Sequence, residues 1–89
     1  MNAIITVVGK DRVGIIAAIC VKLAEFNINV LDISQTILHG SFTMVMAVDI
    51  AQANAAFNKV AEGLKELGQD MGLSIHIQRE EIFDAMHTI

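Results

Sequence analysis

The chain contains no proline, tryptophan or tyrosine, and Cys20 is the single cysteine among its 89 residues. A lone cysteine cannot form a disulfide within the chain, and no Cys-x-x-Cys pair is present to bind a metal. This cysteine usage fits a reducing compartment, so we expect a cytoplasmic location. No proline-rich or low-complexity segment suggests a linker, and we therefore expect one domain.

Long apolar runs and basic segments are also missing. No apolar run approaches the roughly 18 residues that cross a bilayer. No basic segment precedes apolar residues 13–21, so neither a membrane span nor a secretion signal is expected. The chain has only 6 Lys and Arg but 10 Asp and Glu, which gives a pI of about 5.1. Nucleic-acid binding normally needs a basic patch and often stacking aromatics, so this composition argues against it.

Apolar residues are abundant for so short a chain. They make up 54% of the sequence, and the mean hydropathy is +0.56. A domain of this size buries only about two-thirds of its unfolded surface. We therefore expect another subunit to cover the remaining apolar surface, and predict a homodimer or a larger even-numbered oligomer.

Hydrophobic spacing predicts six secondary structure elements. They are a strand over 4–8 that stops at Gly9, a helix over 14–26, strands over 28–38 and 42–50, a helix over 53–71 and a strand over 73–78. The second strand is expected to slip at a bulge between Asp32 and Gln35. A hairpin turn is expected at 39–41, and Gly72 should break the second helix.

The order βαββαβ predicts an α+β, ferredoxin-like fold. Two split βαβ units joined by a hairpin form a four-stranded antiparallel sheet with both helices on one face. We expect the second strand at an edge of this sheet. Residues 1–80 would form this domain, and residues 81–89 a short helical tail with an apolar stripe.

The segment from Gly9 to Gly14 is the first candidate for a ligand site. It joins a strand to a helix N-terminus, whose unpaired N–H groups and dipole attract carboxylates. Asp11 is a candidate N-cap and a candidate partner for a ligand ammonium. Arg12 is a candidate for a bidentate carboxylate contact or for a surface ion pair. The same Gly-polar-Gly pattern can also serve as a turn without any ligand.

Two segments, Asp11-Arg12-Val13-Gly14-Ile15 and Asn27-Ile28-Asn29-Val30, resemble the ACT domain, a regulatory module that binds amino acids. The similarity covers about residues 3–79 and is strongest to small free-standing bacterial ACT proteins and the glycine cleavage repressor group. It implies that two domains pair and that a small amino acid binds at their interface. The ligand-binding residues that it implies are Gly9, Asp11, Arg12, Val13, Gly14 and Asn29. The helix N-terminus adds Ile15, whose backbone N–H is expected to contact the ligand carboxylate.

We therefore expect a non-catalytic regulator that binds a small amino acid and acts on a protein partner in trans. A structural dimer without a small ligand remains an alternative. A ferredoxin-like enzyme such as an acylphosphatase is a weaker one, because the short loop lacks the phosphate-binding pattern. No catalytic residue or cofactor is expected. His39, His76 and His87 lack ligand spacing, so no metal is expected either.

Overall fold

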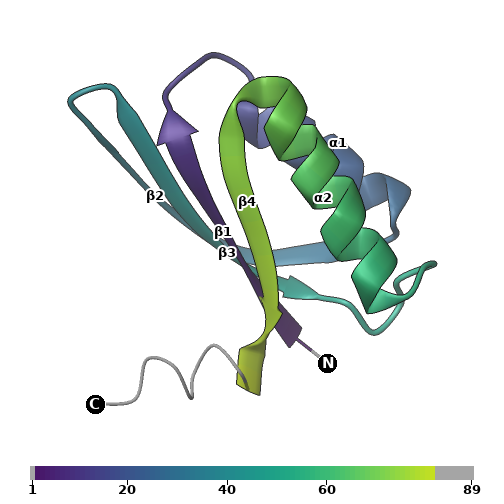
Figure 1. Cartoon of the computed structure of the whole chain (residues 1–89). Helices are drawn as coiled ribbons and strands as arrows, with labels where there is room; N and C mark the ends of the chain where they lie inside the picture. Colours follow the sequence, from purple (N-terminus) through teal and green to yellow (C-terminus); the bar gives the residue numbers. More distant parts are fainter. Residues whose placement is uncertain (1, 82–89) are drawn as a thin grey trace.

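The computed structural model describes residues 2–81; residues 1 and 82–89 lie outside the description, and with them nearly all of the predicted tail. The chain runs through six elements (Figure 1). They are β1 (Asn2–Lys10), α1 (Ile15–Glu25), β2 (Asn29–Leu38), β3 (Ser41–Asp49), α2 (Phe57–Met71) and β4 (Leu73–Arg79). The predicted order of elements is confirmed.

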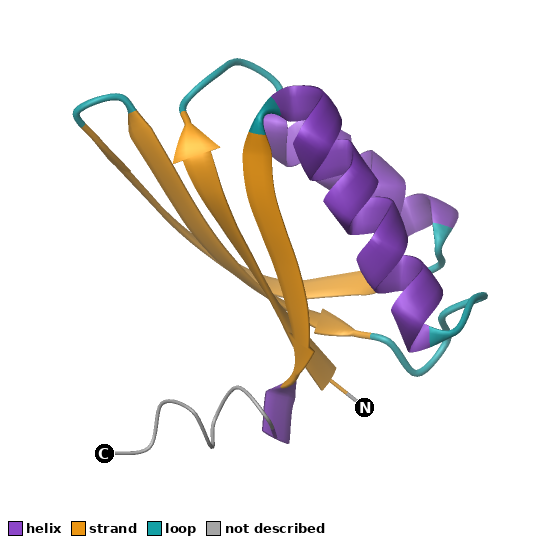
Figure 2. Ribbon diagram, in the orientation of Figure 1, coloured by secondary structure: helices purple, strands orange, loops and turns teal. Residues whose placement is uncertain are grey.

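The four strands form one antiparallel sheet with the order β2-β3-β1-β4. Both helices cover the same face of this sheet, as Figure 2 shows. This is the predicted ferredoxin-like arrangement. Strands β1 and β3 lie in the centre, and β2 lies at an edge as expected.

The core lies between the sheet and the two helices. Successive strand residues point to opposite faces, so every second residue of β1 and β3 is buried beneath the helices. The fully buried large side chains are Ile5, Val7, Ile19, Leu23, Met44, Met46, Val48, Val60 and Leu64. Burial of each such side chain stabilises the fold by about 1.5–3 kcal/mol. Cys20 is half-buried and packs against this core.

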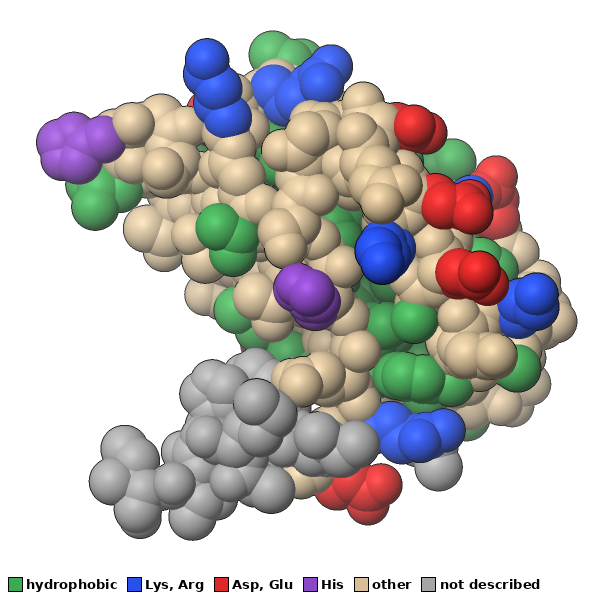
Figure 3. Space-filling model, in the orientation of Figure 1, with side chains coloured by type: hydrophobic (Ala, Val, Ile, Leu, Met, Phe, Trp, Pro, Cys, Tyr) green, Lys and Arg blue, Asp and Glu red, His purple; other side chains and the backbone are tan. Residues whose placement is uncertain are grey.

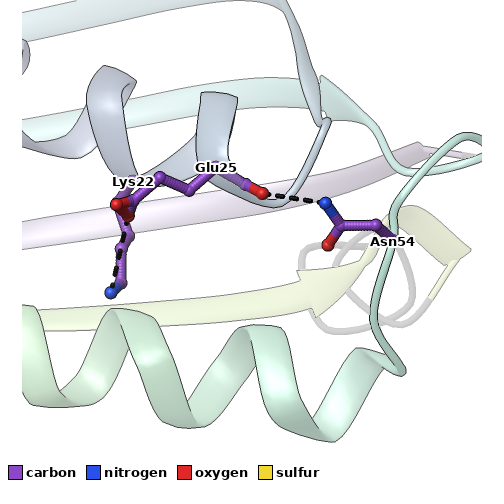
Figure 4. Close-up of polar contacts among 3 residues, drawn as sticks. All are labelled: Lys22, Glu25 and Asn54. Carbon is purple, nitrogen blue, oxygen red and sulfur yellow. Dashed lines mark hydrogen bonds and ion pairs between the residues drawn. The ribbon is translucent and has the colours of Figure 1, made fainter.

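The end of β1, the bulge in β2 and the start of α2 differ from the sequence prediction. Strand β1 does not stop at Gly9 but runs on to Lys10. The bulge in β2 lies between Val30 and Asp32, upstream of the predicted position. Helix α2 begins at Phe57 and not at residue 53. The residues before it are held against the end of α1, because the Asn54 side chain donates to the Glu25 carbonyl at 2.8 Å (Figure 4). The Asn54 backbone amide also donates to the Phe26 carbonyl at 3.0 Å.

The turns follow the expected chemistry. Asn27 adopts a left-handed conformation just after α1, with φ 59°, and its side chain donates to the Gln52 carbonyl at 2.8 Å. His39 and Gly40 both have positive φ, as a two-residue hairpin of the primed type requires. This turn brings β3 back beside β2, so the tip of the hairpin lies next to the segment that follows β1.

Candidate functional site

A cavity of about 350 Å³ lies where the loop after β1 meets the first turn of α1 and the edge strand β2. In Figure 1 this loop lies between the β2–β3 hairpin and the helices. The residues that line the cavity are Asp11, Arg12, Gly14, Ile15, Ile16, Ala17, Gln35, Ile37 and Phe42. Four of the seven predicted site residues are therefore brought together here.

The loop is fixed by backbone interactions. The Asp11 amide donates to the Gly40 carbonyl at 2.8 Å and ties the loop to the hairpin turn. Gly14 precedes the helix in a left-handed conformation, with φ 89°. No side chain caps α1, so the prediction of Asp11 as N-cap is wrong. Asp11 is exposed and lines the cavity, and the N-terminus of α1 receives no side-chain cap hydrogen bond.

Arg12 and Val13 extend outward from the loop. The Arg12 guanidinium donates to the Met71 carbonyl at 3.4 Å, a long hydrogen bond at the C-terminus of α2. The negative end of the α2 dipole favours a cation there. The Val13 side chain is 98% exposed and does not line the cavity. Arg12 thus bridges the loop to α2 as well as lining the site.

Gly9 and Asn29 do not line the cavity, although Gly9 pairs with Phe42, which does. Gly9 belongs to β1, where a Cβ atom would collide with the Leu73 side chain on β4, so this glycine serves strand packing. Asn29 opens β2 and lies opposite Asp49, whereas the cavity borders the other end of the strand. The ten residues of β2 span roughly 30 Å. Asn29 therefore does not meet the loop of its own chain.

Five lining residues were not predicted: Ile16, Ala17, Gln35, Ile37 and Phe42. Gln35 and Ile37 pair with Met44 and Phe42, so they lie on the helix-covered face of β2. The face on which Gln35 and Ile37 lie could have been deduced from the hairpin turn at 39–40, which sets the register of β2 against β3, and from the alternation of β3. A bulge expected within 32–35 left the faces of β2 undefined, which is why these residues were missed.

Strand β2 exposes apolar side chains along an edge without a neighbouring strand. Leu31, Ile33, Ile37 and Leu38 are 50%, 38%, 53% and 63% exposed. Asp32 is the one charged residue in β2. Exposed apolar edges are usually covered in native proteins, because their free backbone groups pair with other chains. This edge borders the cavity directly.

Other features of the surface are less suited to a small ligand. A hollow of about 440 Å³ lies between α2 and β4, and none of the predicted site residues lines it. On the face shown in Figure 3, basic and acidic side chains are dispersed among each other. Within residues 2–81, no three His, Cys, Asp or Glu side chains gather to hold a metal ion. No helix in this part of the chain is long and apolar enough to cross a membrane.

Comparison with known proteins agrees with this fold. Residues 2–78 match the ACT domain family. A UPF0237 protein of Listeria monocytogenes is 54% identical over 89 residues, covering 100% of both chains. The solved structure of an ACT domain protein from Streptococcus pneumoniae superposes with a TM-score of 0.81 at 39% identity, covering 100% of this chain and 97% of that chain.

A putative glycine cleavage system transcriptional repressor shares the fold, with a TM-score of 0.73 at 24% identity, covering 86% of this chain and 44% of that chain. The resemblance inferred from the Asp11–Ile15 and Asn27–Val30 segments is confirmed. The chain belongs to the ACT domain family of regulatory domains.

Proposed function

We propose that this protein is a cytoplasmic, non-catalytic regulator that binds a small amino acid between two copies of the chain and acts on a protein partner in trans. The observation that carries the proposal is the cavity between the loop, the start of α1 and the unpaired apolar edge of β2. A volume near 350 Å³ is at the small end of the range for ligand pockets, about 300–1,000 Å³. A single amino acid is a suitable occupant.

The two ends of an amino acid match the two kinds of polar group at the cavity. The first-turn N–H groups of Ile15 and its neighbours would receive the carboxylate, aided by the helix dipole. The Asp11 carboxylate would receive the ammonium. Charge-assisted hydrogen bonds contribute about 1.5–3 kcal/mol each, so a few of them give micromolar affinity.

A second copy is the occupant that best fits the β2 edge. Two copies of β2 that pair antiparallel around a twofold axis form an isologous interface. This pairing would cover Ile33 and the other exposed apolar residues of β2. It would also place the beginning of one β2 beside the end of the other. The partner subunit's Asn29 would then approach the loop at Asp11, which Asn29 of the same chain cannot reach.

The β2 edge also supports the second candidate, a structural dimer without a small ligand. The apolar edge alone requires pairing, whereas the uncapped helix start, Asp11 and the cavity do not follow from pairing. An enzymatic role has less support, since the groups that meet at the cavity are one carboxylate, one guanidinium, one side-chain amide and apolar side chains. We therefore favour ligand binding.

Calorimetric titration of the full chain with each of the twenty amino acids tests the proposal. We expect binding by at least one small amino acid, and a loss of tenfold or more in affinity in Asp11→Ala. Asp70→Ala removes another exposed acid, at the far end of α2, and should leave the affinity unchanged. No binding to a chain that sedimentation shows to be a dimer would favour the structural alternative. Equal affinities of wild type and Asp11→Ala would contradict the proposed site.

A further inference from the structure

We infer that the cavity selects amino acids with a branched aliphatic side chain. The inference rests on the proposed function and specifies the chemistry of the ligand. Its basis is the composition of the cavity wall beyond the two charged residues on the rim. The carboxylate and ammonium positions are common to all amino acids, so selectivity must come from this wall.

The wall that α1, β2 and β3 supply to the cavity is mostly apolar. Ile15 and Phe42 are almost completely buried, at 2% and 3% exposure, and form its floor. Ile16 and Ala17 line it from α1, and Ile37 lines it from β2. Gln35 is the one uncharged polar side chain among the nine lining residues. A ligand side chain that enters between α1 and β2 therefore meets mostly carbon atoms.

The two charged lining residues, Asp11 and Arg12, are exposed and come from the loop, so the parts of the wall that belong to α1, β2 and β3 carry no charge. Arg12 also donates to the Met71 carbonyl. A charged ligand side chain that lies against the α1 and β2 wall would lose water there and meet no charged partner on that wall, which is unfavourable. Acidic and basic amino acids should therefore bind poorly.

Shape and polarity together favour branched aliphatic ligands over polar ones of equal size. Each methylene that enters an apolar site strengthens binding by about fourfold. A hydroxyl in the same position loses its water without gaining a hydrogen bond, except where it reaches Gln35. Valine and threonine have nearly the same shape, so their relative affinity isolates this polarity effect.

The experiment is calorimetric titration with glycine, valine, threonine, leucine and asparagine. We expect valine or leucine to bind at least tenfold more tightly than glycine. Threonine should bind at least fivefold more weakly than valine, and asparagine at least fivefold more weakly than leucine. Glycine serves as the reference because it carries both charged groups without a side chain.

Two variants at position 37 locate the effect. Ile37→Val and Ile37→Thr give side chains of nearly equal shape, both compatible with a strand. Valine should bind at least threefold more weakly to Ile37→Thr than to Ile37→Val, while glycine should bind both equally. Unchanged glycine affinity would also show that the site and the dimer are intact in both variants.

The possible outcomes separate this inference from the proposed function. Threonine or glycine binding as tightly as valine would overturn the aliphatic selectivity and leave the amino-acid site standing. Equal valine affinities of the two variants at position 37 would likewise overturn it. If none of the twenty amino acids binds to the intact dimer, the inference and the proposed function both fail.

Discussion

Gly68 lies on the side of α2 that packs against β4. A Cβ atom at this position would lie 2.6 Å from the Leu73 carbonyl oxygen and 3.2 Å from a side-chain carbon of Ile75. Both are closer than ordinary contacts, and the carbonyl belongs to the backbone, which shifts less readily than a side chain. Helix propensity alone predicts that Gly68 weakens α2 by about 1 kcal/mol relative to alanine. Packing reverses that expectation.

Gly68→Ala should therefore lower the free energy of unfolding, by about 1–3 kcal/mol, because the added methyl group overpacks the contact between α2 and β4. Gln69→Ala is the matched control, since Gln69 is exposed on the same helix and its replacement should change stability by less than about 0.5 kcal/mol. Chemical denaturation followed by circular dichroism measures both. A Gly68→Ala variant more stable than wild type would show that propensity outweighs packing here.

The secondary structure elements were predictable wherever a single periodicity dominates. Strand β3 alternates cleanly, and its buried side lies where the sequence indicates. The start of α2 was not predictable, because the position of 53–56 depends on hydrogen bonds from Asn54 to the end of α1. The site shows the same division. The loop could be identified from the sequence, whereas the place of Gln35 and Ile37 in the cavity wall could not, because it depends on the register of a bulged strand.

Strand β2 is the element whose exposed edge most clearly requires a partner. It is the longest strand, lies at an edge and exposes four large apolar side chains. The other edge strand, β4, is shorter and presents Ser74 and His76 as exposed residues. Short, polar edges resist association, and long apolar edges promote it. Self-association should therefore use β2.

Ile33→Lys should weaken self-association by at least tenfold, because a lysine on each copy sets two like charges against an apolar edge. Ser74→Lys places the same charge on β4 and should leave the oligomeric state unchanged. Sedimentation velocity over a range of concentrations distinguishes these outcomes, with circular dichroism to verify folding. If Ser74→Lys dissociated the oligomer and Ile33→Lys did not, the interface would be formed by β4 and not by β2.

Within one chain, the two parts of the proposed site lie far apart. The sheet order and register put the Asp11 loop at one end of β2 and Asn29 at the other. A twofold axis through the β2 edge would bring the partner subunit's Asn29 to the loop of this chain. The proposed amino-acid site would then require two copies, and ligand binding would stabilise the dimer by mass action. Each dimer would contain two identical sites.

Mixing two variants that each lack amino-acid binding tests this account most directly. Asp11→Ala and Asn29→Ala should each lose most amino-acid binding. In a mixed dimer, one site combines an intact Asp11 with an intact Asn29, and the other site carries both substitutions. We predict that calorimetric titration of the re-equilibrated mixture recovers high-affinity binding, at about one site per mixed dimer. Binding that stays as weak as in the separate variants would contradict a site shared between subunits.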